Sequence, residues 1–495
     1  MRLKAKLLNI ESGGTLIIVL NPKVMKELDL EPADRVRVMS EKKYAVAITD
    51  VSSAVDETEI GIFDEVKALL DVETGQPITI IPEEQPVTIT SIKKKLDGIK
   101  LSEDELFELV TDIVDNRLTK AEIASFVTAV YIRGMELDET EHLTRAMAET
   151  GQMLKLGVKP VVDLHSIGGV PNNRTTMIVI PIIASAGLYI PKTASRAITD
   201  PAGTADTMEV LAPVSLGLDD IKEIVLQHHG CIVWGGSLNI APADDLIIEI
   251  EHPLQLDPTA MLLASILAKK YAVGATDLLL EIPFGPGTKA TKARANELEK
   301  KFVALGGRLG INVEVVKTDG SQPVGKGVGP ILEARDVLQV LENSKDAPAD
   351  LRARSLYFAG LLLEIGKKAK QGSGLKMATE ILKSGKALTK FKEIIKAQGG
   401  DPELNSIDLH PGKYDETIYA EKSGTIQGID DDSIKKIGRH LGAPYNKGAG
   451  IYLWNKVGDK VKEGEKLFTI YAESGRKLSE GLAFAETNNP FRIKT

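Results

Sequence analysis

The sequence has 495 residues, of which 43% are hydrophobic and 26% are charged, and its formal net charge is −9. A chain of this length and composition is typical of a globular protein with several domains, so disordered and fibrous classes are excluded. The negative net charge argues against a protein that binds nucleic acid through a basic surface. The single cysteine, Cys231, cannot form an internal disulfide, which is typical of a reducing compartment.

Neither a signal peptide nor a membrane span is expected. The first residues, MRLKAKLLNIESGG, lack the long apolar core of a signal peptide. The best candidate for a span, from Met177 to Ile190, is shorter than the ~20 apolar residues that cross a bilayer. The sequence therefore predicts a cytoplasmic protein without membrane contact.

The first region, residues 1–85, has alternating apolar and polar positions, as in Val36-Arg37-Val38, between Gly, Pro and Asp turn signals. Alternation with a period of two is typical of strands with one buried face. We therefore expect a small β-rich, barrel-like domain. The stretch from Glu83 to Pro86 reads as a linker.

The second region, residues 86–158, has the period of amphipathic helices. Ser102 and Thr119 are each followed three residues later by a glutamate, which is the pattern of a capping box at a helix start. This region is predicted to form a helical domain.

From residue 159 to residue 340, short β-branched runs alternate with helical patterns, and Ile232-Val233-Trp234 is one such run. This alternation is typical of an α/β domain with buried central strands, and we expect a central mixed sheet. Residues 341–495 are expected to form a further α/β part. From about residue 416, short strands with Gly turns predict a β-rich module like a barrel-sandwich.

A glycine-rich turn follows the first predicted strand of the α/β domain, in the run from Asp163 to Val170. It contains His165, Ser166 and two glycines, whose backbone N–H groups can face an anion. Glycine turns more often serve only the backbone, so both interpretations stay open on local sequence.

A second segment, from Ala194 to Asp206, contains hydroxyl side chains, Arg196 and a plausible helix start at Thr204. The planar, permanently charged arginine side chain suits phosphate oxygens. A surface salt bridge together with a helix cap is the alternative interpretation.

A third segment, from Leu256 to Lys270, ends in Ser-Ile-Leu-Ala-Lys-Lys. Together with the two glycine-containing segments, this run makes the sequence similar to the pyrimidine nucleoside phosphorylase superfamily. The similarity extends over essentially the whole chain. Residues 1–85 resemble the extra N-terminal domain of the archaeal AMP phosphorylases within it. The resemblance implies that helices near 258–272 join the helical domain, and that the C-terminal module is of the nucleoside phosphorylase type. It also implies a homodimer that assembles further through the N-terminal domain.

The resemblance implies phosphorolysis of the N-glycosidic bond of AMP, and also of CMP and UMP, to free base and ribose 1,5-bisphosphate. Inorganic phosphate is then a co-substrate, and no cofactor or metal is required. Asp257 resembles the proton donor of these enzymes. In that role, a neutral carboxylic acid protonates N7 of the departing purine. Capping of the following helix is the alternative role for Asp257. The implied nucleotide-binding residues are Gly169, Ser195, Arg196, Ala197, Ile198, Thr199, Asp200, Thr204, Ser265 and Lys289, and the phosphate-binding candidates are His165, Ser166, Gly168 and Lys269.

Three positions depart from the related enzymes. Leu164 stands where nucleoside phosphorylases carry a lysine before the His-Ser pair, which favours a nucleotide substrate. Ala194 and Asp200 stand where serines are expected in the nucleotide enzymes. A carboxylate at position 200 repels a 5′-phosphate unless a cation such as Arg196 pairs with it.

Phosphorolysis of a nucleotide is therefore weighed against two alternatives, phosphorolysis of thymidine or another nucleoside, and nucleotide binding without catalysis. A related reading, phosphoribosyl transfer, shares the fold but is expected to use Mg²⁺ and pyrophosphate. Domain closure is expected, with hinges at glycine-containing connections such as Gly320 to Gly329. His228, His229 and Cys231 lack further ligands at metal-binding spacing, so a structural role is predicted for them.

Overall fold

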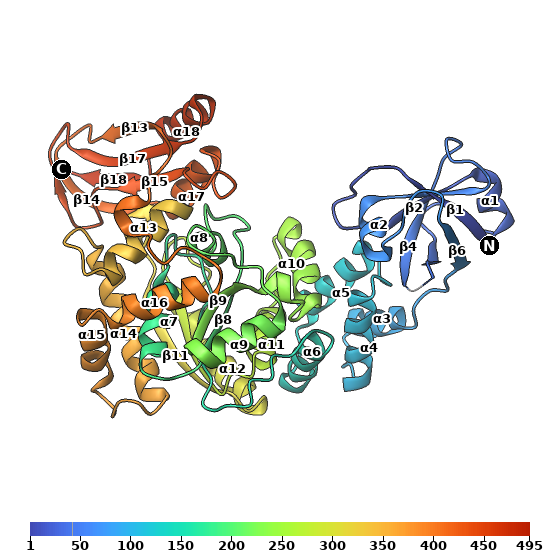
Figure 1. The fold of residues 1–495 in the computed structure, drawn as a ribbon, viewed down its shortest axis with the longest axis horizontal. Coiled ribbons are helices and arrows are strands. Elements are labelled where there is room, and N and C mark those ends of the chain that lie inside the picture. Colours follow the sequence, from blue (N-terminus) through green and yellow to red (C-terminus); the bar gives the residue numbers. More distant parts are fainter. Residues whose placement is uncertain (42) are drawn as a thin grey trace. The chain divides into compact units, whose positions relative to one another are not determined.

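The computed structural model describes residues 1–41 and 43–495 (Figure 1). The chain divides into two compact units, of which unit 1 is Met1–Gly151 with Ala241–Ala268, and unit 2 is Gln152–Ile240 with Lys269–Thr495. The segment from Gly320 to Gly329 lies inside unit 2, whereas the chain passes between the units after residues 151, 240 and 268. The segment from Gly320 to Gly329 therefore does not join the two units, and domain closure stays a prediction.

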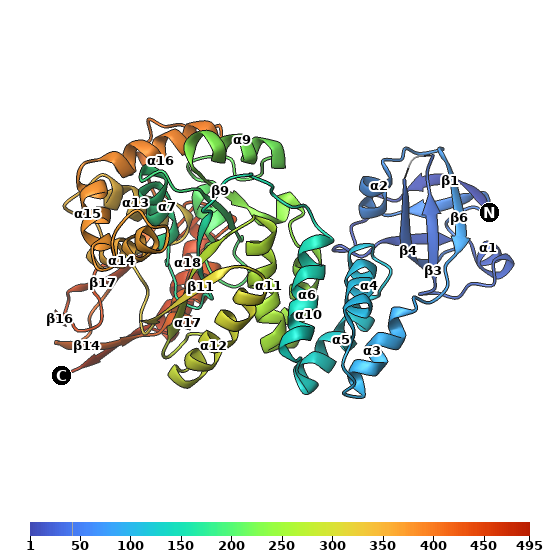
Figure 2. The same cartoon turned by 90° about the horizontal axis from the view of Figure 1, so that it is seen from below.

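Unit 1 begins with a closed barrel in the strand order β1-β5-β2-β4-β3-β6 (Figure 2). Ile18, Val36 and Ile60 point into its core and are fully buried, because the two-residue period sends alternate side chains inward. Two of the strand pairs, β1 with β5 and β2 with β4, are parallel. The elements are β1 (Arg2–Leu7), β2 (Ile17–Leu20), α1 (Pro22–Glu27), β3 (Arg35–Met39), β4 (Tyr44–Val51), β5 (Glu59–Ile62), α2 (Asp64–Leu70) and β6 (Pro77–Pro82).

The rest of unit 1 is a helical bundle. Both predicted capping boxes are confirmed, because Ser102 and Thr119 each exchange two hydrogen bonds with the glutamate at the third helical position. A buried ion pair joins Lys95 to Glu139 at 2.8 Å. The helices are α3 (Thr88–Leu96), α4 (Glu103–Val114), α5 (Lys120–Arg133), α6 (Leu137–Glu149) and α10 (Pro242–Leu254), which packs on α4, α5 and α6, and α11 (Thr259–Ala272) starts in this unit.

Unit 2 contains the predicted α/β sheet. Strands β7 (Val162–Ser166), β10 (Asp277–Phe284) and β11 (Asn312–Asp319) pair in the order β11-β10-β7, and β8 (Ile190–Ala194) pairs with β9 (Gly230–Trp234). A single bridge between Val161 and Tyr189 links the two groups.

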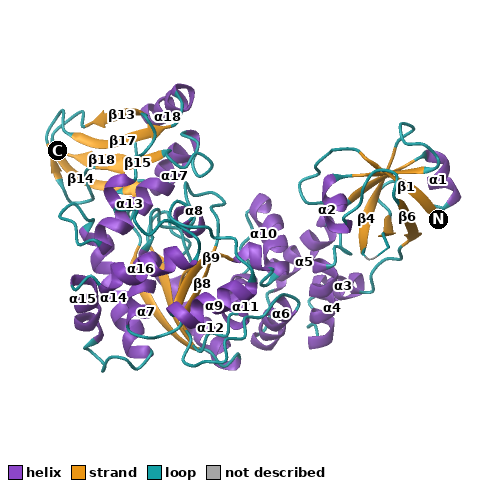
Figure 3. Cartoon of the chain, viewed as in Figure 1, coloured by secondary structure: helices purple, strands orange, loops and turns teal. Residues whose placement is uncertain are grey.

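All of these pairs are parallel, so the expected mixed sheet is wrong for the described strands. Helical crossovers explain the difference, since a chain that returns through a helix re-enters the sheet in the same direction. Figure 3 shows the strands among helices α7 (Thr175–Ser185), α9 (Leu218–His228) and α12 (Lys292–Arg308).

A large hydrophobic core joins helix α7 to the helices that follow the sheet in the chain. Ile178 and Ile182 of α7 pack there with Leu362 and Phe391, and all four are fully buried. The added helices are α13 (Pro330–Leu341), α14 (Ala349–Ile365), α15 (Gly374–Lys383) and α16 (Lys386–Ala397).

The C-terminal module consists of two antiparallel sheets, in the orders β12-β15-β17-β13 and β16-β14-β18. Ile426, Ile434 and Phe468 are fully buried in its core. Among the described residues, no helix has both the length and the apolar character required to cross a membrane. The elements are β12 (Gly327–Val328), β13 (Tyr414–Tyr419), β14 (Gly424–Ile429), α17 (Asp431–His440), β15 (Gly450–Leu453), β16 (Lys460–Val461), β17 (Lys466–Ala472), α18 (Gly475–Thr487) and β18 (Phe491–Lys494).

Candidate functional site

The turn from His165 to Gly169 leaves the carboxyl end of β7, the end at which parallel sheets bind ligands. Gly168 and Gly169 have φ values of 86° and 99°, which favour glycine. A Cβ on Gly169 would lie 3.1 Å from the backbone nitrogen of Lys289. The fold thus brings this turn against the loop that carries Lys289.

That loop runs from Gly285 to Lys289 after β10. The Thr288 hydroxyl donates to the Gly285 carbonyl oxygen at 2.8 Å, which closes the loop. Lys289 is exposed, and its ammonium group has no hydrogen-bond or ion-pair partner in the part of the chain that the structure describes. An exposed ammonium of this kind is available to an anionic ligand.

The segment from Ser195 to Thr204 follows β8 and is held by one buried carboxylate. Asp206 accepts hydrogen bonds from the N–H groups of Ala197 at 2.7 Å and Gly203 at 2.9 Å. These bonds fix the backbone of the segment, while the side chains of Ser195, Ile198 and Thr199 stay exposed to solvent.

Arg196 forms ion pairs with acidic side chains of this chain, as the salt-bridge interpretation of this segment predicts. Its guanidinium contacts Asp206 at 3.2 Å and Glu209 at 2.5 Å, and it lies 4.8 Å from the ring centre of Trp234. Its hydrogen bonds, together with Lys447, lower the pKa of Glu209 to about 2. Arg196 therefore anchors the loop, and its contribution to nucleotide binding stays a prediction.

Thr204 is the first residue of α8 (Thr204–Met208), and its hydroxyl accepts a hydrogen bond from Arg174 at 3.4 Å. Arg174 is buried, pairs with Glu333 at 2.5 Å and donates to the carbonyl oxygen of Ala202. Sequence reasoning missed this arginine. The polar run Asn172-Asn173-Arg174 directly after the glycine turn is the signal that points to it.

Asp200 has a cationic partner, but the prediction that this partner is Arg196 is wrong. Lys435 of α17 lies 3.7 Å from the Asp200 carboxylate and donates to the carbonyl oxygen of Gly169 at 3.1 Å. Arg196 is already engaged by Asp206 and Glu209. Lys435 thus neutralises Asp200 and holds the glycine turn at the same time.

We expect Lys435→Met to raise the KM for an anionic substrate about tenfold, because Asp200 is left without its cation. Steady-state kinetics measure this change. Lys436→Met, which removes an exposed lysine on the same helix, serves as the matched control. Addition of Asp200→Ser to Lys435→Met is expected to recover most of the loss, and a double variant no better than the single one would contradict the charge explanation.

Two predicted residues, Asp257 and Ser265, belong to unit 1, and the others belong to unit 2. Asp257 lies just before α11 with an exposed side chain. Among residues 1–41 and 43–495, Asp257 has no hydrogen-bond partner, so the helix-cap alternative lacks its hydrogen bond. Ser265 donates to the buried carboxylate of Asp244 at 2.9 Å. Lys269 follows on the same helix, within unit 2.

A group of buried charges lies behind the glycine turn and was missed by sequence reasoning. Asp163 pairs with Lys270 at 2.6 Å and with Lys192 at 3.6 Å. Burial, followed by the charge of Lys270 and other nearby lysines, holds the pKa of His165 well below its ordinary value. His165 is therefore a neutral imidazole at physiological pH.

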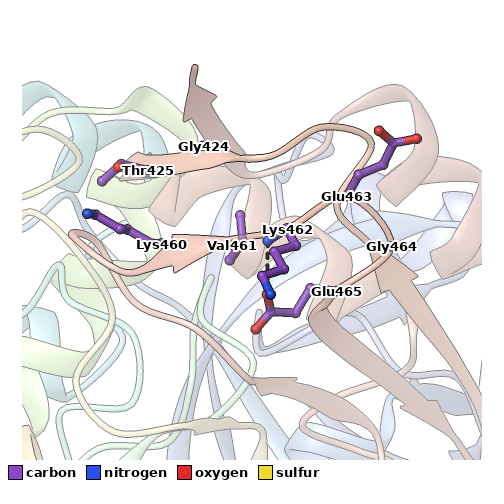
Figure 4. Close-up of a pocket in the computed structure, with 8 residues that line it drawn as sticks. All are labelled: Gly424, Thr425, Lys460, Val461, Lys462, Glu463, Gly464 and Glu465. Carbon is purple, nitrogen blue, oxygen red and sulfur yellow. Dashed lines mark hydrogen bonds between the residues drawn. The ribbon is translucent and has the colours of Figure 1, made fainter.

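A cavity of about 880 Å³ lies elsewhere in unit 2, against strands β14 and β16 (Figure 4). Thr425 and Lys460 face each other there in the strand register, and the Lys462 N–H donates to Glu465 at 2.9 Å. Its lining contains none of the predicted site residues. The cavity belongs to the C-terminal module.

The described residues contain no group of three or more His, Cys, Asp or Glu side chains arranged to hold a metal ion. His229 packs on Tyr189, with 4.6 Å between the ring centres. Burial raises the pKa of Cys231 to about 12, so this thiol stays protonated.

Comparison with known proteins identifies three family domains. Residues 89–151 match the helical bundle domain of a glycosyl transferase family, residues 158–255 match the a/b domain of a glycosyl transferase family, and residues 425–491 match the pyrimidine nucleoside phosphorylase C-terminal domain. The crystal structure of anthranilate phosphoribosyltransferase from Thermus thermophilus is similar, with a TM-score of 0.54 at 19% identity, over 63% of this chain and 99% of that one. At this identity the likeness concerns the fold alone.

Similarity to curated proteins extends over the full length of the chain. An AMP phosphorylase of Pyrococcus furiosus is 46% identical over 495 residues, which are 100% of this chain and 98% of that protein. AMP phosphorylases of Thermococcus kodakarensis, at 47% with 100% and 98% coverage, and Methanosarcina mazei, at 44% with 100% and 97% coverage, are similar as well. The chain therefore belongs to the AMP phosphorylase family, within the thymidine phosphorylase superfamily.

Proposed function

We propose that this protein is a pentosyltransferase that cleaves AMP with inorganic phosphate. Orthophosphate attacks C1′ of the ribose, the bond from C1′ to the base nitrogen breaks, and adenine and ribose 1,5-bisphosphate are formed. The observation that carries the proposal is the identity to AMP phosphorylases over the whole chain. The close approach of the Gly169 turn and the Lys289 loop supports it, because the reaction needs sites for two phosphate groups.

The proposed roles follow the charges that develop in the reaction. The glycine turn, with His165 and Ser166, and Thr204 hold the orthophosphate nucleophile. The loop from Ser195 to Thr199 and Lys289 hold the 5′-phosphate of the nucleotide. Such fixed groups contribute chiefly by positioning the anions and by stabilising charge in the transition state.

Asp257 is proposed as the proton donor. As the C–N bond weakens, negative charge gathers on the purine, which is a poor leaving group as an anion. A protonated Asp257 gives its proton to N7, so that the base departs neutral, and the carboxylate regains a proton afterwards. Ser265 and Lys269 are proposed to contact the base or ribose.

We extend the proposal to CMP and UMP as further substrates, within nucleotide salvage in the cytoplasm. No cofactor is proposed, because the anions are bound by hydroxyl, backbone N–H and ammonium groups. We further propose a homodimer that associates into larger assemblies through the N-terminal barrel. Light scattering of the full chain, compared with a chain lacking residues 1–85, measures this association.

The proposal is tested by base release from AMP, CMP, UMP, adenosine and thymidine, each with and without phosphate, with chromatography of the products. We expect phosphate-dependent release from AMP but not from adenosine, unchanged by a chelator. Release from the nucleosides alone would favour a nucleoside phosphorylase. A requirement for Mg²⁺ and pyrophosphate would favour phosphoribosyl transfer, and no release would favour a binding protein.

Lys289→Met is expected to lower kcat/KM for AMP about 10- to 100-fold, because a charge-assisted hydrogen bond to the 5′-phosphate is lost. The KM for inorganic phosphate should stay unchanged. Lys292→Met, at an exposed lysine on α12, is the matched control. If Lys289→Met instead raises the KM for phosphate and spares AMP, the two anion sites are exchanged relative to the proposal.

A further inference from the structure

Two lysines share one aspartate in the interior of unit 2. Asp163 of β7 is 0% exposed, Lys192 of β8 is 5% exposed and Lys270 of α11 is 1% exposed. The Asp163 carboxylate lies 2.6 Å from the Lys270 ammonium and 3.6 Å from that of Lys192. With both lysines protonated, this group carries one positive charge more than its carboxylate neutralises.

An unbalanced charge in a protein interior is costly, and it is retained most readily where a ligand of opposite charge compensates it. The two neutral titratable neighbours, His165 on β7 and Cys231 on β9, do not provide this compensation. The pKa of His165 lies well below its ordinary value, and the pKa of Cys231 is raised to about 12. The ammonium groups of Lys270, Lys192 and Lys289 also lower the pKa of His165, so this histidine lies in a positive environment. A bound anion would therefore compensate the excess positive charge of the buried group.

Lys192 is connected directly to the glycine turn. Its ammonium group donates to the carbonyl oxygen of Leu164 at 2.7 Å, and the next residues are His165 and Ser166. Leu164 itself offers no charge at this position. The ammonium group of Lys192 thus contacts the backbone of β7 directly before His165 and Ser166.

We propose that Lys192 is a positioning residue for the orthophosphate nucleophile, which fixes the end of β7 and supplies positive charge to the anion bound at the turn from His165 to Gly169. This inference rests on the proposed function, because that function assigns orthophosphate to this turn. Lys192 acts through the backbone and through its electric field, and it does not touch the ligand.

The proposal predicts a pH dependence of anion binding. Burial lowers the pKa of Lys192 to about 7, opposed by the charge of Asp163. Below this pH Lys192 is an ammonium group that attracts an anion, and above it Lys192 is neutral and adds no attraction. Anion affinity should therefore fall as the pH rises through about 7. His165 cannot cause this fall, since it is already neutral there. Asp431, which lies against Gly287 and whose pKa burial raises to about 7, titrates in the same range. The Lys192→Arg variant separates the two groups, because an effect of Asp431 would persist in it.

Sulfate is the suitable probe, because it remains a dianion across this pH range whereas phosphate changes its charge. We expect calorimetric titration of the wild type to show roughly tenfold tighter sulfate binding at about pH 6 than at about pH 8.5. Lys192→Met should bind sulfate weakly at both pH values. Lys192→Arg keeps its charge throughout and should bind with little pH dependence. Lys95→Met removes a buried lysine from an ion pair in unit 1. It is expected to lower stability, because Glu139 is left unpaired, but to bind sulfate with the affinity and pH dependence of the wild type.

A wild type whose sulfate affinity does not change with pH would overturn the proposal, even if Lys192→Met failed to fold. So would a folded Lys192→Met protein with wild-type affinity and pH dependence. Steady-state kinetics add a second test, since Lys192→Met should raise the KM for phosphate about tenfold and spare the KM for AMP. Equal increases in both values would point to a general structural role. Sulfate titration needs no turnover, so its result is separate from a failure of the wild type to cleave AMP.

Discussion

Replacement of Asp257 by asparagine is expected to lower kcat for AMP phosphorolysis by about 10²- to 10⁴-fold, the usual contribution of a positioned general acid. Asparagine has nearly the same shape as aspartic acid but no acidic proton for N7 of the base. The KM for AMP should change little, because the side chain is exposed and makes no hydrogen bond within the described residues. Steady-state kinetics with AMP measure both constants.

A substrate that needs no proton provides the sharper test of this role. AMP methylated at N7 already carries positive charge on the base, so its base departs neutral without a donor. The Asp257→Asn variant should cleave this analogue at nearly the wild-type rate. An equal loss with AMP and with the methylated analogue would show that Asp257 does not act as the acid. Glu249→Gln, at an exposed carboxylate of α10, controls for the loss of a surface charge.

Gly203→Ala is expected to remove most nucleotide binding and to destabilise unit 2 by about 1–3 kcal/mol, the usual effect of overpacking. A Cβ at this position would lie 2.5 Å from the carbonyl oxygen of Ser195 and 2.6 Å from the carbonyl carbon of Arg196. Both are backbone atoms, so relief requires the whole loop to move. That movement would disturb the hydrogen bond from the Gly203 N–H to Asp206.

Denaturant unfolding measures the stability of this variant, and the KM for AMP measures its binding. The matched control is Gly307→Ala in α12, where no heavy atom lies within 4 Å of the added Cβ. This control should be neutral or up to about 1 kcal/mol more stable, because alanine favours a helix over glycine. If Gly203→Ala bound AMP as tightly as the Gly307→Ala control, the loop would not need its present backbone to hold the nucleotide.

Features that depend on neighbouring residues were predictable from the sequence alone. The capping boxes at Ser102 and Thr119 involve residues within one helical turn, so their spacing is a sufficient signal. The buried strand faces of the N-terminal barrel follow from alternation along single strands. The turn at Gly168 and Gly169 was recognisable because few other residues adopt its φ values. Family membership could also be inferred, because the three motifs occur in order along the whole chain.

Features that join residues distant in the sequence were decided by the tertiary structure. Lys435, rather than the nearby Arg196, pairs with Asp200, because Asp206 and Glu209 already engage Arg196. The sheet is parallel because of its helical crossovers, whereas a local strand pattern carries no direction. The buried lysine Lys192 meets Asp163 only when β8 lies beside β7. Local sequence determined the elements and the glycine turns, and long-range packing decided the charges around them, because an ion pair depends on distance in space.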